Sequence, residues 1–84
     1  MRKQAYSILV YNNPGLLSRM AGLFSRRGYN IESITAGTTA DPRFTRITIV
    51  ASGDEQILSQ IEKQVRKMED VIEIKPLNDS NSVC

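Results

Sequence analysis

The sequence predicts an α+β fold in which four strands form an antiparallel sheet and two helices cover one of its faces. Three observations support this. Several stretches alternate apolar and polar residues as strands do, two others repeat apolar residues at helical spacing, and these segments follow one another as β-α-β-β-α-β. With right-handed crossovers this order gives the ferredoxin-like βαββαβ arrangement.

The first strand is expected at residues 4–11, where Tyr6, Ile8 and Val10 share one face. The opposite face also carries apolar groups, which is typical of a central strand. A helix follows, with apolar residues at i, i+3, i+4 and i+7 and two more that widen the stripe: Leu17, Met20, Ala21 and Phe24, flanked by Leu16 and Leu23. Gly22 inside this helix costs about 1 kcal/mol relative to Ala, which suggests close backbone packing.

Gly28 is expected to end the first helix in the left-handed conformation. The second and third strands are predicted at residues 31–37 and 45–52, and a loop over residues 38–44 joins them as a hairpin.

A second amphipathic helix is predicted from residue 55 to about residue 67, because Ser52 and Glu55 have the spacing of a capping box just before an apolar repeat. The last strand is expected at residues 71–77, with Ile72 and Ile74 facing inward. Pro76 has no N–H to donate, so this strand should lie at a sheet edge. The polar tail, residues 78–84, is expected to be disordered.

The composition indicates one small domain that another copy or another chain would help to stabilise. Lys and Arg are scattered and the net charge is +2, so nothing favours nucleic-acid binding. One Cys, at position 84, excludes an internal disulfide and indicates a reducing compartment. No apolar run approaches the roughly 18 residues that span a bilayer, and no signal peptide is evident, so we expect a cytoplasmic protein.

Catalysis and metal binding are disfavoured, because the chain has no His and no evident pairing of a nucleophile with a base. RNA recognition on this fold needs aromatic residues on the central strands, and residues 45–50 have none. Phosphate-loop and dinucleotide spacings are absent as well.

Small-molecule binding at the first turn remains, where Asn12-Asn13-Pro14-Gly15 precedes a helix. A helix N-terminus offers unpaired N–H groups that can hold a carboxylate or a phosphate, and Gly15 is expected to supply a permissive backbone. The corner at Asn30 is expected at the same end of the sheet. The alternative is a plain tight connection, since these residues are common turn formers.

These residues resemble a known family. The strings at residues 12–19 and 22–33, the second reading Gly-Leu-Phe-Ser-Arg-Arg-Gly-Tyr-Asn-Ile-Glu-Ser, are very similar to the ACT domain of the regulatory small subunit of acetohydroxyacid synthase, also called acetolactate synthase. Asp41-Pro42, residues 46–49 and residues 53–64 continue the match. The resemblance covers about residues 3–77, so we expect an ACT domain over residues 1–77.

The resemblance implies a non-catalytic subunit that binds and activates a catalytic subunit and often confers feedback inhibition by valine or another branched-chain amino acid. It implies thiamine diphosphate, Mg and FAD on that catalytic subunit and no cofactor on this chain. ACT domains generally pair, so a homodimer is expected. The family's effector positions fall on Asn12, Gly15, Leu16, Leu17, Ser18, Asn30 and Ile31.

Three readings stay open at this point. The first is the regulatory subunit that the resemblance implies. Many family members continue into a second domain, so such a subunit could be a naturally short one, which could activate without sensing valine, or a truncated one. A free-standing ACT module that senses an amino acid for another metabolic enzyme is the second reading. A small enzyme on the same fold is the third, and the absence of His disfavours it.

Overall fold

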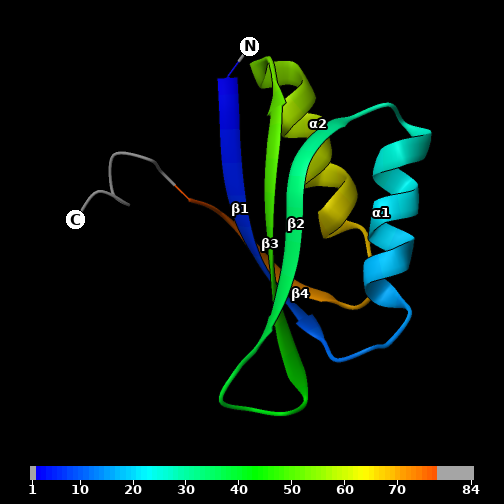
Figure 1. The fold of residues 1–84 in the computed structure, drawn as a ribbon, viewed down its shortest axis with the longest axis vertical. Coiled ribbons are helices and arrows are strands. Elements are labelled where there is room, and N and C mark those ends of the chain that lie inside the picture. The colour runs from blue at the N-terminus through cyan, green and yellow to red at the C-terminus, as the bar shows by residue number, and fades with distance from the viewer. Residues whose placement is uncertain (1, 78–84) are drawn as a thin grey trace.

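The computed structural model describes residues 2–77 and contains six elements in the predicted order: β1 Arg2–Tyr11, α1 Leu16–Arg26, β2 Asn30–Thr38, β3 Phe44–Gly53, α2 Glu55–Arg66 and β4 Val71–Leu77. The strands form one antiparallel sheet in the order β2-β3-β1-β4. Both helices lie on the same side of the sheet (Figure 1). The predicted ferredoxin-like fold is therefore confirmed. The tail expected to be disordered lies outside the described residues.

The core lies between the helices and the covered face of the sheet. As predicted, β1 is a central strand and β4, in which Pro76 lies opposite Tyr6, is an edge strand. Gly28 has φ 72° and ends α1 as expected. The buried apolar side chains come from five of the six elements: Tyr6, Ile8, Val10, Leu16, Met20, Phe24, Ile47, Ile49, Ala51, Leu58, Ile61, Val65 and Ile74.

The buried face of α1 is narrower than the apolar stripe predicts. Leu16, Met20 and Phe24 are buried at i, i+4 and i+8, whereas Leu17 keeps 37% of its surface exposed. The helix is therefore turned so that part of the stripe faces outward. The prediction of close packing at Gly22 is wrong, because that residue is exposed and an added Cβ would meet no neighbouring atom within 4 Å.

The start of α2 also differs from the predicted capping box. Asp54 caps the helix, and its Oδ1 accepts a hydrogen bond from the Ile57 N–H at 2.9 Å. Ser52 cannot act as the cap because Ser52 and Gly53 still belong to β3, where they pair with β1. The capping residue must directly precede the first helical residue.

Ile72 does not face the core, contrary to the prediction, and 43% of its surface is exposed. The register between β1 and β4 shifts between Leu9 and Val10, so Val10 lies opposite Val71 while Leu9 lies opposite Glu73. Ile72 falls in this irregularity, which interrupts the alternation of faces. Ile74, beyond the shift, is buried as predicted.

Candidate functional site

The first turn is closed by the side chain of Asn13. Its Oδ1 accepts from the Gly15 N–H at 3.1 Å, and its backbone carbonyl accepts from the Leu16 N–H at 3.0 Å. Gly15 has φ −89° and ψ −4°, a region open to any residue. The expectation that Gly15 provides a special backbone conformation is therefore wrong. An added Cβ there would meet only Asn13 Oδ1, at 3.9 Å.

The N-terminus of α1 retains free donors. Gly15 makes no side-chain cap, and the first turn contains no acidic residue. The backbone N–H of Arg19 donates to the Gly15 carbonyl at 3.1 Å. Within residues 2–77, however, the N–H groups of Leu17 and Ser18 have no acceptor. Both residues are exposed. These two donors and the positive end of the helix dipole together suit a carboxylate.

Asp70 holds this turn in place from the connection between α2 and β4. Its Oδ2 accepts from Asn13 Nδ2 at 3.1 Å and from Arg19 Nη2 at 2.5 Å. Its backbone carbonyl accepts from the Tyr11 N–H at 2.9 Å. Sequence reasoning missed Asp70 because it is far from the turn along the chain. The signal that could have found it is topological, since the start of β4 lies beside the end of β1.

Asn12 attaches the same turn to the hairpin between β2 and β3. Its N–H donates to the Arg43 carbonyl at 2.8 Å, and its Nδ2 donates to the Pro42 carbonyl at 3.3 Å. The Thr45 hydroxyl donates to Asn12 Oδ1 at 3.4 Å. The loop itself is fixed by Asp41, whose carboxylate accepts from Arg43, an interaction that lowers the pKa of Asp41. Asn12 thus has a structural role.

The second corner lies where β2 begins. Asn30 Nδ2 donates to Ser52 Oγ at 2.7 Å, and Ser52 Oγ donates to Glu32 Oε2 at 3.1 Å. Ser52 is only 5% exposed. Residues at the start of β2 also line a cavity of about 410 Å³ between this strand and the second half of α1. The cavity is lined by Ala21, Phe24, Ser25, Tyr29, Asn30, Ile31, Glu32, Ser33 and Ile34.

The two corners lie at opposite ends of the sheet, which corrects the expectation that they share one end. Tyr11, just before the first turn, pairs with Phe44, whereas Asn30 pairs with Ser52. Phe44 and Ser52 are near the two ends of β3. At about 3.3 Å per residue, roughly 26 Å of strand separates them. A single copy of the chain brings Asn12, Gly15, Leu16, Leu17 and Ser18 together but leaves Asn30 and Ile31 apart from them.

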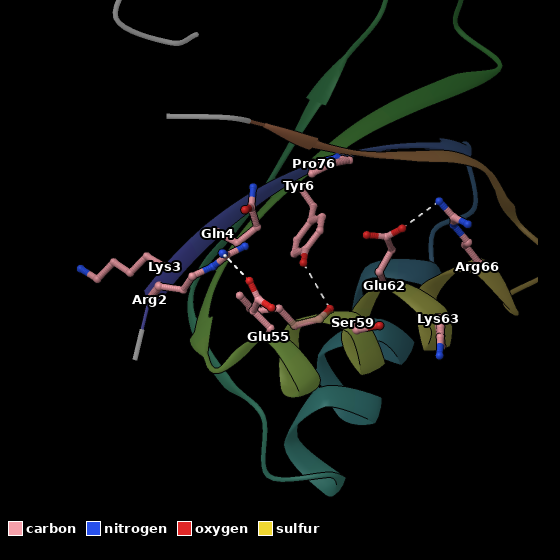
Figure 2. A pocket seen from close by; sticks show the side chains of 11 residues that line it. Arg2, Lys3, Gln4, Tyr6, Glu55, Ser59, Glu62, Lys63, Arg66 and Pro76 are labelled. Carbon is pink, nitrogen blue, oxygen red and sulfur yellow. Dashed lines mark hydrogen bonds and ion pairs between the residues drawn. The ribbon is translucent and has the colours of Figure 1, made fainter. Parts of the chain in front are cut away.

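A larger cavity, of about 780 Å³, lies between β1, β4 and α2 (Figure 2). Four of its six charged side chains form two ion pairs, since Arg2 contacts Glu55 at 3.2 Å and Arg66 contacts Glu62 at 2.8 Å. The buried Tyr6 hydroxyl donates to the Leu58 carbonyl at 3.2 Å. In Figure 2 the side chains of the other two charged residues, Lys3 and Lys63, point away from the cavity. Charges that are already paired give a ligand little to bind.

Within residues 2–77, no three His, Cys, Asp or Glu side chains gather where they could hold a metal ion. No helix in this range is long and apolar enough to cross a membrane.

The chain is similar to known proteins over nearly all of its length. It is 49% identical over 77 residues to a probable acetolactate synthase small subunit of Methanothermobacter thermautotrophicus, covering 92% of this chain and 46% of that protein. It is 48% identical over 81 residues to the acetolactate synthase isozyme 3 small subunit of Escherichia coli, covering 96% of this chain and 50% of that protein. The chain thus spans about half the length of these relatives.

The fold and a family model agree with these relatives. The crystal structure of the acetolactate synthase small subunit from Thermotoga maritima matches with a TM-score of 0.85 and 40% identity, covering 94% of this chain and 49% of that one. The ACT domain of GTP pyrophosphokinase from Chlorobium tepidum matches with a TM-score of 0.72 and 16% identity, covering 89% of this chain and 96% of that one. At this identity the match shows the fold alone. The model of the AHAS small subunit-like ACT domain matches residues 6–73. AHAS stands for acetohydroxyacid synthase, and this chain belongs to its small subunit-like ACT domain family.

Proposed function

We propose that this chain is a regulatory, non-catalytic subunit of a thiamine-diphosphate-dependent acetolactate synthase in the cytoplasm. It binds the catalytic subunit, raises its activity, and takes up valine or a related branched-chain amino acid as a feedback inhibitor. Relatives named as acetolactate synthase small subunits support the association. The observation that carries effector binding is the pair of free N–H groups at Leu17 and Ser18 on the uncapped start of α1.

The chemistry of the proposed site suits a free amino acid. The effector carboxylate accepts hydrogen bonds from the first-turn N–H groups, where the helix dipole favours a negative charge. Leu17 offers an exposed apolar surface beside them, and Ile31 lines the apolar cavity at the other corner. The proposed effector residues remain the seven predicted from the sequence: Asn12, Gly15, Leu16, Leu17, Ser18, Asn30 and Ile31.

The separation of the two corners supports a site shared between two copies. β2 is an edge strand, so its outer edge is free to pair with β2 of a second copy. Antiparallel pairing about a two-fold axis reverses one copy relative to the other, which puts Asn30 of one copy at the end of the sheet where its partner carries the first turn. We therefore propose a homodimer that binds the effector between its copies. Sedimentation at tens of micromolar should give the dimer mass, and a monomer mass would reject it.

The Gly15→Asp variant tests the effector site. The structure has room for the new Cβ, and an acidic group at a helix N-terminus is otherwise favourable, so the fold should survive. Its carboxylate would compete with that of the effector for the same N–H groups. Valine binding measured by calorimetry should weaken about tenfold or more, while dimerisation persists.

Gln60→Glu is the matched control, because it adds the same charge on an exposed position of α2. It should bind valine as the unmodified chain does. Unchanged binding in Gly15→Asp would remove the site from the first turn. Smaller losses of valine affinity are expected for Asn12→Ala and Asn30→Ala. The Asn12 amide also holds the hairpin between β2 and β3.

Reconstitution separates the two functions in the proposal. Mixing the chain with an acetolactate synthase catalytic subunit should raise the rate of acetolactate formation, and valine should lower that rate again. Activation without a valine effect would restrict the chain to an activator. Amino-acid binding without any activation would instead favour an ACT module that serves another metabolic enzyme.

A further inference from the structure

We propose that Asp70 is a positioning residue for the effector. It orders the start of α1 from outside the helix, and so keeps the N–H groups of Leu17 and Ser18 free for the effector carboxylate. This inference rests on the proposed function, because it concerns the same ligand. It starts from a difference between the two helices. The residue directly before α2 caps that helix with its side chain, whereas Gly15, at the same position of α1, makes no side-chain cap.

The cap of α2 shows why an ordinary cap would interfere with ligand binding. Asp54 Oδ1 accepts from the Ile57 N–H at 2.9 Å, so this donor is already occupied. A helix start without a cap keeps its donors, but such an end frays. A ligand that binds a frayed helix start must order it, which lowers the affinity. The start of α1 therefore needs another source of order.

Asp70 supplies this order through three contacts that bracket the first turn of the chain. Before the turn, its backbone carbonyl accepts from the Tyr11 N–H at 2.9 Å. Within the turn, its Oδ2 accepts from Asn13 Nδ2 at 3.1 Å. After the turn, the same oxygen accepts from the Arg19 guanidinium on α1. One residue of the connection between α2 and β4 thus holds both sides of the turn.

These contacts leave the helix donors unoccupied. Asn13 transmits the constraint to Gly15, because Asn13 Oδ1 accepts from the Gly15 N–H at 3.1 Å. Within residues 2–77, neither Asp70 nor Asn13 accepts from the N–H of Leu17 or Ser18. Asp70 therefore orders the start of α1 without competing with the effector.

The charge of Asp70 and its position have opposite effects on effector binding, so an experiment can separate them. A carboxylate near the site repels that of the effector, and its removal would free the positive charge of Arg19. If charge alone mattered, loss of Asp70 would tighten valine binding. We expect the effect of position to dominate, because the Arg19 side chain is 58% exposed and solvent screens exposed charges.

The test measures valine binding by calorimetry. Asp70→Ala should weaken it about tenfold, and Asp70→Asn, which keeps an acceptor for Asn13, only about threefold. Glu62→Ala is the matched control, because it also removes an ion pair with an arginine, and the Glu62 side chain is 27% exposed against 25% for Asp70. This control should bind valine as the unmodified chain does. Unchanged or tighter binding in Asp70→Ala would overturn the role of Asp70 and leave the proposed function intact.

Two further measurements test how Asp70 acts. The double variant Asn13→Ala/Asp70→Ala should lose less valine affinity than the product of the two single losses, because Asp70 acts partly through Asn13. Without ligand, the Arg19 N–H, which donates to the Gly15 carbonyl, should exchange with solvent faster in Asp70→Ala, whereas the Leu58 N–H in α2 should not. Losses that multiply, or unchanged exchange at Arg19, would overturn this role. An unmodified chain that binds no valine would overturn both this inference and the proposed sensing function.

Discussion

Two glycines at α1 should respond in opposite directions to the same substitution by Ala. Gly28 adopts φ 72°, where an L-residue pays about 1–2 kcal/mol. Gly22 lies inside the helix, where Ala is better than Gly by about 0.8–1 kcal/mol. An added Cβ meets no neighbouring atom within 4 Å at either position. Backbone conformation, rather than packing, therefore sets both effects.

The expected separation between the two variants is large for a domain of this size. Gly28→Ala should lower the free energy of unfolding by about 1–2 kcal/mol, and Gly22→Ala should raise it by about 1 kcal/mol. The difference of about 2–3 kcal/mol corresponds to roughly 8–24 °C between their melting temperatures, at about 4–8 °C per kcal/mol.

Thermal unfolding followed by far-ultraviolet circular dichroism would measure this separation. The protein concentration must be matched between variants, because association makes the melting temperature depend on concentration. Gly28→Asn should lose less than Gly28→Ala, since Asn enters the left-handed region more readily. Shifts in the same direction for Gly22→Ala and Gly28→Ala would refute the reasoning.

Two further predictions concern the core. Gly53→Ala should lower the free energy of unfolding by about 1–3 kcal/mol in urea titrations, because the added Cβ would lie 2.9 Å from Cγ2 of the stiff Ile57 side chain. A stabilising effect like that of Gly22→Ala would contradict this. Burial, assisted by Glu62, raises the pKa of Tyr6 above 10.0, so the folded state keeps this proton to higher pH than the unfolded state. The stability of the unmodified chain relative to Tyr6→Phe should therefore be constant below pH 10 and fall above it, and a difference that does not change with pH would count against this account.

The order and type of the elements could be predicted from the sequence because each has a local pattern. Alternation identified the strands, helical spacing identified α1 and α2, and Pro76 correctly placed β4 at an edge. The failures involve tertiary structure. Nothing in the local pattern of β4 shows the register shift that exposes Ile72, and the stripe on α1 does not reveal which part of it turns away from the core.

The residues of the candidate site stay a prediction, whereas their expected arrangement at one shared corner is wrong. A right-handed β-α-β crossover makes β1 and β2 parallel, so the end of β1 and the start of β2 must lie at opposite ends of the sheet. This consequence follows from the predicted topology, and the expectation of one shared corner overlooked it. Asp70 is different, because only long-range pairing of β4 with β1 brings it to the turn.

Folding and sensing have different structural requirements in the proposed dimer. The core that includes Ile8, Phe24 and Ile61 is complete within one copy, whereas the effector contacts two. A ligand that binds only the paired form stabilises that form by mass action, so valine affinity would rise with protein concentration and valine would strengthen the dimer. A change confined to the outer edge of β2 would then abolish sensing without unfolding the chain. Regulation would depend on how the copies pair rather than on the stability of either one.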